Sequence, residues 1–303
     1  MRIIITSVIV AALATQAGAQ DLIAPKGAPA KYTAPHRPIT KWVELKAKHA
    51  GHTDWRELIV DDDRLHAEYI MAKPGTKEPR SVHPDTRAWW VVTDGQIRFD
   101  IEGQESFVAA KGSIVQVPMQ TLFSFETIDD KPSVRFEVNI AGAKTLYTSD
   151  VKPPQMPGFD WIPVRFPRKP GVYGRNNKAH TTFDEVAKQL EEGKLKGTIP
   201  IVDDDRGAAN FIYGHERNLP PLSLKDKGHF HPEGSEFWLI MAGQIRYPIE
   251  AQGVIIADVG DVVYVPKNTF HAPRWWGPGP SCRLAMNGYP YISHLFEPDL
   301  GNH

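Results

Sequence analysis

The sequence predicts an all-β protein that contains two tandem copies of one small antiparallel barrel or sandwich. Two observations carry this prediction: the chain repeats itself, and each copy consists of short strand-like runs separated by turn residues. The 24 glycines and 26 prolines among 303 residues also favour many turns over long helices. We therefore expect mostly strands, with a short helix between the two copies.

The repeat is clearest at an offset of 148 residues. The matching pairs include Trp90 and Trp238, Gly-Gln-Ile-Arg at 95–98 and 243–246, and Val-Pro at 117–118 and 265–266. Upstream, Asp-Asp-Asp-Arg occurs at 61–64 and again at 203–206, an offset of 142, so the second copy carries six more residues after this point. A register held over about thirty residues indicates an internal duplication.

Strand signals lie on both sides of the repeated glycine. Residues 88–92 and 236–240 are aromatic and β-branched runs that end shortly before this turn. Residues 96–101 and 244–249 follow the turn and alternate apolar with polar positions, which is typical of strands with one buried face. Several short strands at this spacing predict a small antiparallel barrel or sandwich in each copy.

The first segment has the layout of a secretory signal peptide. Arg2 is followed by the apolar run 3–14 and then by Ala17-Gly18-Ala19, small residues that match an A-x-A cleavage site. The apolar run is shorter than the roughly 20 residues that a membrane anchor needs. We expect cleavage after residue 19 and a mature protein that is secreted and free of the membrane, most simply in a bacterial periplasm.

The segment between the copies differs in composition from both of them. Six prolines between residues 151 and 177 predict an extended connector. Thr182 and Glu185 then form a capping box at the start of a short helix, which ends at Gly193. The predicted organisation is a signal peptide at 1–19, a first barrel with its lead-in at 20–146, the connector and helix at 147–200, and a second barrel at 201–303.

Composition and charge exclude one class of partner and one class of site. Lys+Arg 35 against Asp+Glu 36 give a formal net charge of -1, which leaves no basic excess to bind a nucleic acid. The single cysteine, Cys282, is too few for an internal disulfide or a thiolate zinc site. A metal site built from several thiolates is therefore excluded.

A cluster of candidate nitrogen and oxygen ligands lies in the second copy. Residues 229–243 have the pattern H-x-H-x4-E-x6-G, and residues 260–271 have the pattern G-x5-P-x-N-x2-H. Three imidazoles and one carboxylate suit one divalent transition-metal ion per chain, which the residues leave open among manganese, iron, nickel, copper and zinc. The second copy is therefore predicted to bind a metal that keeps room for water or substrate.

The predicted geometry follows from strand periodicity. Residues two apart in a strand face the same side, so His229 and His231 are expected to point into the barrel. The turn after them is expected to return Glu236 on the neighbouring strand. A second hairpin, shaped by residues 260–266, is expected to deliver His271 to the same interior.

Both patterns resemble the two consensus motifs of the cupin superfamily, and the repeat makes the whole chain resemble a bicupin. The resemblance covers residues 55–145 and 200–295. It implies that each copy is a jelly-roll barrel and that the four residues of the second copy are metal ligands. It also implies a site of the kind that bicupin enzymes use.

The first copy departs from this pattern. At the 148 offset, the four ligand positions are occupied by Ser81, His83, Ala88 and Phe123. One imidazole alone does not hold a divalent ion tightly. We therefore expect the first barrel to be structural, or to line an apolar pocket, and only the second to bind metal.

The resemblance implies an enzyme that acts on a small organic molecule, and a dioxygenase for an aromatic or phenolic substrate is the first hypothesis. Decarboxylases, isomerases and lyases use the same ligands, and a non-catalytic periplasmic protein that binds a small molecule or metal is the alternative from another class. Glu233 is assigned as a general base at the pocket mouth, with a solvated turn residue as its other interpretation. Barrels of this type often pair, which leaves the oligomeric state open between a monomer and a homodimer.

Several aromatic residues near the motifs suit a moderately apolar, aromatic substrate. Trp238, Tyr247 and Tyr264 are candidates to line the cavity, and Trp275-Trp276 to close its rim. Core packing is the other interpretation of each of these residues.

Overall fold

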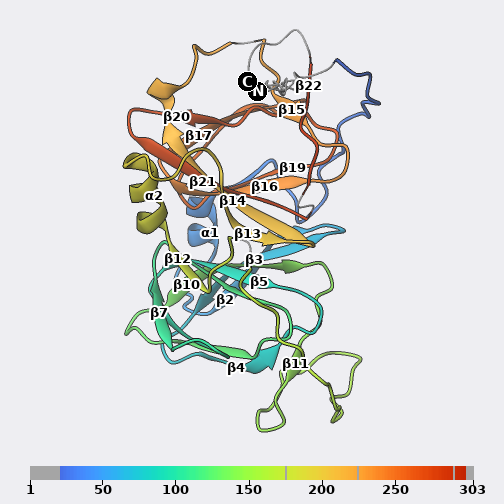
Figure 1. The fold of residues 1–303 in the computed structure, drawn as a ribbon, viewed down its shortest axis with the longest axis vertical. Helices are drawn as coiled ribbons and strands as arrows, with labels where there is room; N and C mark the ends of the chain where they lie inside the picture. The colour runs from blue at the N-terminus through green and yellow to red at the C-terminus, as the bar shows by residue number, and fades with distance from the viewer. Residues whose placement is uncertain (1–20, 175, 224, 289–290, 298–303) are drawn as a thin grey trace, which may run out of the picture.

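The computed structural model describes residues 21–174, 176–223, 225–288 and 291–297. The predicted signal peptide at 1–19 lies outside these residues. Within them the chain forms two β-barrels stacked along the long axis of the molecule, with the second barrel above the first in Figure 1. No helix in these ranges has the length and apolarity needed to cross a membrane.

The first barrel consists of two antiparallel sheets. The larger sheet contains, in order, β12 (His180–Thr182), β8 (Ser113–Val117), β5 (Ala88–Asp94), β10 (Ser133–Ile140), β3 (Leu65–Ala72) and β2 (Trp55–Asp61). The smaller sheet contains β11 (Leu146–Tyr147), β4 (Lys77–Val82), β9 (Phe123–Thr127), β6 (Gln96–Ile101) and β7 (Phe107–Ala110).

The second barrel repeats this arrangement. Its larger sheet contains β1 (Ile39–Thr40), β19 (Val262–Val265), β16 (Glu236–Ala242), β21 (Pro280–Asn287), β14 (Gly207–His215) and β13 (Ile199–Asp204). Facing it are the pair β15 (His229–Phe230) and β22 (Leu295–Phe296) and the group β18 (Gly253–Ala257), β17 (Gln244–Ile249) and β20 (Arg274–Trp276). The described elements are mostly strands and form two tandem barrels, as predicted.

Three short helices complete the described part of the chain, and they are α1 (Trp42–Lys48), α2 (Phe183–Glu191) and the 3-10 helix η1 (Glu216–Asn218). Helix α2 is the helix predicted between the copies, and the Thr182 side chain accepts a hydrogen bond from the Glu185 backbone as the capping box requires. Helix α1 has no side-chain cap at Lys41, which explains why no comparable signal marks it in the sequence.

Each barrel receives an edge strand from the segment that precedes the other barrel. Strand β1 leads into the first barrel but pairs with β19 of the second, with Ile39 opposite Val263. Strand β12 leads into the second barrel but pairs with β8 of the first, with His180 opposite Val115. The duplication therefore includes a strand and helix ahead of each barrel, and the two lead-ins are exchanged.

Glycines at the repeat position allow these lead-in helices to dock closely. Gly112 and Gly260 both have φ +86, and a side chain on either would press against Phe183 or Trp42, respectively. Asp261, beside Gly260, also accepts hydrogen bonds from the Trp42 backbone and the Lys41 ammonium. These contacts tie the lead-in of the first barrel to the second barrel.

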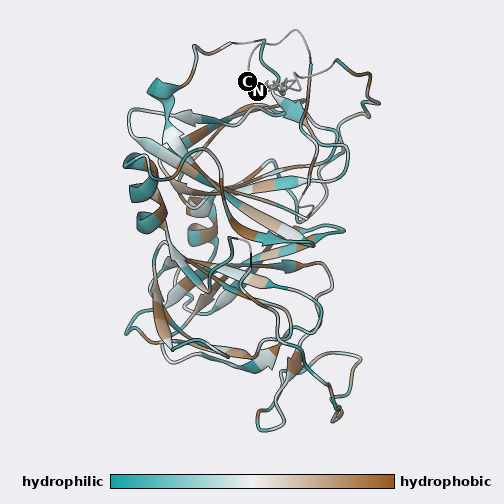
Figure 2. Cartoon of the chain, in the orientation of Figure 1, coloured by the Kyte–Doolittle hydropathy of each residue, from teal (hydrophilic) through white to brown (hydrophobic). Residues whose placement is uncertain are grey.

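The two larger sheets pack against each other and enclose a core shared by both barrels. Phe136 on β10 and Phe237 on β16 are fully buried there, with ring centroids 6.4 Å apart. The opposite faces of the two larger sheets point into separate barrel interiors, where further apolar clusters contain Trp90 on β5 and Trp238 on β16. Figure 2 shows hydrophobic residues along the strands of both barrels, whereas α2 is mostly hydrophilic on the side in view.

Because the core is shared, we expect Phe237→Ala to destabilise both barrels together. Loss of a buried phenylalanine costs about 3–5 kcal/mol in the free energy of unfolding. Urea unfolding followed by far-UV circular dichroism and tryptophan fluorescence should give coincident transitions, both shifted to lower urea. Val108→Ala, at a position that is 45% exposed, is the control and should change the midpoint little. An early transition confined to one probe would contradict a shared core.

Candidate metal centre

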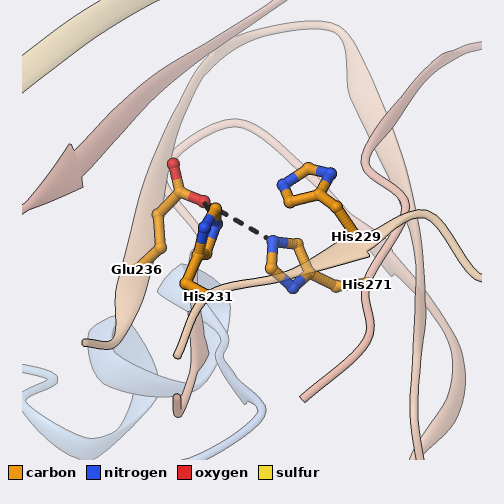
Figure 3. Close-up of side chains that lie close together, drawn as sticks. All are labelled: His229, His231, Glu236 and His271. Carbon is orange, nitrogen blue, oxygen red and sulfur yellow. Dashed lines mark hydrogen bonds and ion pairs between the residues drawn. The ribbon is translucent and has the colours of Figure 1, made fainter. Parts of the chain in front are cut away.

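Four side chains of the second barrel lie close together and point toward one another (Figure 3). His229 lies on β15 and His231 one residue beyond it, Glu236 begins β16, and His271 lies between β19 and β20. One potential ligand atom from each residue falls within a set whose members are all within 4.8 Å of one another. His229 is partly buried and the other three are buried.

The route of the chain to these positions differs from the prediction. Glu236 does not lie on a strand neighbouring β15, because β16 belongs to the larger sheet and β15 to the facing strands. His271 is likewise not delivered within a hairpin: after β19 the chain leaves the larger sheet and His271 bridges His229 and Ile249. Glu236 comes from the larger sheet, whereas His229 and His271 come from the facing side of the barrel. Ligands from both sides can surround an ion that lies between them.

The close pairing of the His229 and His271 backbones depends on a glycine. The two residues exchange backbone hydrogen bonds of 3.1 and 2.9 Å. Gly228, with φ +71, precedes them, and a Cβ there would clash with the carbonyl oxygen of His271. Glycine is therefore the residue that lets these two ligand-bearing segments approach.

Backbone carbonyls orient two of the imidazoles. His231 Nδ1 lies 2.7 Å from the Ser293 carbonyl oxygen, and His271 Nδ1 lies 2.9 Å from the Thr269 carbonyl oxygen. A carbonyl only accepts, so Nδ1 is the protonated nitrogen and donates in each case, which leaves Nε2 available toward the centre. This is the support that metal-binding histidines generally have.

Two imidazole nitrogens at the centre are buried without a hydrogen-bond partner among the described residues, and they are His229 Nε2 and His271 Nε2. His271 Nε2 lies 3.5 Å from Glu236 Oε2, which is too long for a good hydrogen bond. Buried polar atoms are normally satisfied, so unpartnered nitrogens that face a carboxylate fit a metal ion.

The charge states of His229 and Glu236 agree with this interpretation. Burial and the neighbouring His271 lower the pKa of His229 to about 2, so its imidazole is neutral at neutral pH. Burial alone would raise the pKa of Glu236, but the hydrogen bond to His231 and the nearby His271 ring hold it well below its ordinary value. Neutral imidazole and ionised carboxylate are the forms that bind metal. In this structure His231 instead pairs with Glu236, with Nε2 3.0 Å from Oε2. Burial would lower the pKa of His231, but its hydrogen bond with Glu236 raises it above the ordinary value.

The first barrel keeps the scaffold of the centre without its ligands. Ser81 pairs with Phe123 on adjacent strands, as His229 does with His271. His83 Nδ1 lies 2.9 Å from the Lys144 carbonyl oxygen, the same type of support that His231 receives. The histidine and its support are therefore retained while the other ligand positions hold Ser81, Ala88 and Phe123.

The C-terminal segment adds residues that the sequence analysis missed. The His294 ring centroid lies 4.6 Å from that of His229 and 4.7 Å from that of His231, although His294 has no ligand spacing. Strand β22 carries it there by pairing with β15, and only this long-range pairing marks the residue. Ser293 lies beside it and donates hydrogen bonds to Glu233 from its backbone N–H and its hydroxyl.

Glu233 is thus placed next to the centre but outside the four ligands. Burial would raise its pKa, but the hydrogen bonds from Ser293 lower it, so the carboxylate is ionised at neutral pH. By holding Ser293, Glu233 also supports the carbonyl that orients His231. Its assignment as a general base stays a prediction.

The candidate lining residues separate into two groups. Trp238 contacts both His271 and Tyr247, each with ring centroids 5.2 Å apart, so both aromatic residues lie in the interior beside the centre. Tyr264 faces the core shared by the two barrels and does not line the site. Trp275 packs into the interior cluster and Trp276 against Arg246, and neither has a described contact with the four ligands.

The fold and this centre define the class of the protein as a bicupin. The cupin domain family matches residues 69–139 and 216–286, one match in each barrel, so the chain contains two cupin domains. The resemblance inferred from the sequence motifs is thereby confirmed. No curated protein matches the chain.

Solved structures share the fold at low sequence identity. Salicylate 1,2-dioxygenase from Pseudaminobacter salicylatoxidans is 12% identical, with a TM-score of 0.61 over 86% of this chain and 88% of that chain. A mutant of Bacillus subtilis oxalate decarboxylase is 16% identical, with a TM-score of 0.51 over 88% of this chain and 80% of that chain. Another structure of that decarboxylase is described with Mn(II) centres.

We expect His231→Ala to lower the metal content of the purified protein to less than about a tenth of wild type, because one of four ligands is lost. His83→Ala is the matched control, since it removes the equivalent imidazole from the first barrel, and it should leave the metal content unchanged. Elemental analysis after loading and desalting measures both. Equal metal loss in the two variants would contradict the assignment of the centre to the second barrel.

Proposed function

We propose that the protein is a metal-dependent dioxygenase that acts on a small aromatic or phenolic molecule. The observation that carries this proposal is the contact of Trp238 with His271, which places an apolar aromatic wall directly beside the metal ligands. The similarity of the fold to a salicylate 1,2-dioxygenase supports it.

Some residues of the site would bind the metal, and others form its surroundings. His229, His231, Glu236 and His271 would hold one divalent ion, which when bound supplies open positions that polarise a substrate and activate dioxygen. Trp238 and Tyr247 pack in the interior cluster and exclude water from one side of the centre. Glu233, ionised and held by Ser293, accepts a proton from a phenolic substrate at the mouth of the site.

A metal-dependent decarboxylase is the second candidate function. The similarity of the fold to an oxalate decarboxylase, which extends along most of this chain, favours it. A periplasmic protein that binds its ligand without converting it is the third interpretation of the same site. The three differ in whether dioxygen and substrate are consumed.

Oxygen uptake tests the proposal. Protein loaded separately with iron, manganese, copper, nickel or zinc is supplied with phenols and aromatic acids in an oxygen-electrode cell. We expect metal-dependent oxygen consumption with at least one combination, and its loss in His271→Ala. Conversion that continues unchanged without dioxygen would favour the decarboxylase, and binding without conversion would favour the binding protein.

We further propose that the protein works outside the cytoplasm, in a bacterial periplasm, after removal of residues 1–19. The signal-peptide layout of that segment supports this proposal. Expression of the full chain in a Gram-negative host, followed by osmotic-shock fractionation and mass spectrometry, should recover a mature protein that starts at Gln20. Recovery of the uncleaved chain in the cytoplasmic fraction alone would contradict it.

A further inference from the structure

Arg283 is a buried cation inside the second barrel, and none of the described carboxylates is bonded to it. The residue is 9% exposed and lies on β21 opposite Ile212 and Ile240, both of which belong to the interior cluster. Its Nε has no hydrogen-bond partner in the part of the chain that the structure describes. A buried guanidinium without an acceptor is costly, so its retention needs a reason.

The first barrel shows what such an arginine binds. Arg135, at the repeat position of Arg283, is buried and places its guanidinium 3.1 Å from carboxylate oxygens of both Glu137 and Glu78. The indole nitrogen of Trp90 donates a hydrogen bond of 2.8 Å to the same carboxylate of Glu137. An arginine and a tryptophan thus hold a carboxylate inside this barrel, and the carboxylate is part of the protein.

The second barrel keeps both donors and lacks that carboxylate. Trp238 stands at the position of Trp90, but Ala285 stands at the position of Glu137. The position of Glu78 is taken by Asp226, which accepts a hydrogen bond from the Gly228 backbone outside the strands. The acceptor of the first barrel has therefore been removed while the arginine and the indole remain.

The second barrel has also gained a donor. Tyr247 replaces Phe99 beside the same tryptophan, with ring centroids 5.2 Å apart in the second barrel and 5.7 Å in the first. Its hydroxyl is buried without a partner among the described residues. The interior of the second barrel thus contains three potential donors, from Arg283, Trp238 and Tyr247. The first barrel has two donors at the corresponding positions, together with the carboxylate that accepts from them.

We propose that Arg283, Tyr247 and Trp238 bind the carboxylate of a small organic acid, in the place that Glu137 occupies in the first barrel. This inference deepens the proposed function and rests on it for the identity of the bound acid as substrate. Trp238 contacts His271 as well as Tyr247, so an acid held there extends toward the metal ligands.

The repeat suggests a variant for the test. Ala285→Glu places a glutamate in the second barrel at the position that Glu137 occupies in the first. The first barrel accommodates this residue beside Arg135, so the variant is expected to fold and to retain its metal. Its carboxylate should fill the proposed subsite. Isothermal titration of metal-loaded protein with acetate, oxalate, benzoate and salicylate, and with acetamide and benzamide as uncharged analogues, measures the effect.

We expect wild-type protein to bind at least one of these acids more tightly than its amide. Ala285→Glu should abolish that binding, and Arg283→Gln should weaken it by roughly 10- to 100-fold. Tyr247→Phe removes only an unpartnered hydroxyl, so it should fold as well as wild type and weaken binding by roughly 5- to 10-fold. Arg246→Gln, which removes a cation that packs against Trp276, is the control and should bind as wild type does.

The titration tests the carboxylate subsite and the oxygen measurement tests the dioxygenase, so either proposal can be contradicted without the other. Acid binding that depends on Arg283 and Tyr247, without any oxygen uptake, would support the subsite and overturn the dioxygenase. Acid affinity unchanged in both Ala285→Glu and Tyr247→Phe, or no preference of wild type for acids over amides, would overturn the subsite. Oxygen uptake in the presence of a phenol would still support the dioxygenase in that case.

Discussion

The site depends on the larger sheet of the second barrel, because alternate residues of its strands serve two environments. On β16, Phe237 faces the core shared by the barrels, while Glu236 and Trp238 face the barrel interior. On β21, Cys282 and Leu284 face the shared core and Arg283 lies between them. Packing between the two barrels therefore sets where the carboxylate ligand, the indole and the guanidinium lie relative to one another.

This arrangement gives the first barrel a function in the second, although it lacks the ligand set. Its larger sheet supplies the other half of the shared core. The segment that leads into it, β1 and α1, lies along an edge of the second barrel, where β1 pairs with β19. Comparison with the first barrel also shows how the two copies have diverged. His83 with its carbonyl support, and the Arg135–Glu137–Trp90 group, show which features are inherited and which residues the second barrel has changed.

The strand pattern, the capped helix and the four metal-ligand candidates were predictable from local sequence, because strand periodicity, the capping box and ligand spacing are local properties. The exchange of the lead-in strands was not, since β1 is two residues long and gains its stability from pairing with β19. The predicted positions of Glu236, on the strand next to His229, and of His271, in a hairpin, are wrong. Residue spacing does not say which sheet a strand joins. His294 and Ser293 were missed for the same reason, as β22 reaches β15 only in three dimensions.

The four candidate ligands lie in the second barrel, so we infer that this barrel binds a metal ion and that the first does not. Anomalous X-ray scattering from crystals of the metal-loaded protein tests it most directly, since it locates the ion without reference to activity. We expect one peak per chain, between His229, His231, Glu236 and His271, and none beside His83. A peak in the first barrel, or none at the four ligands after loading, would contradict it.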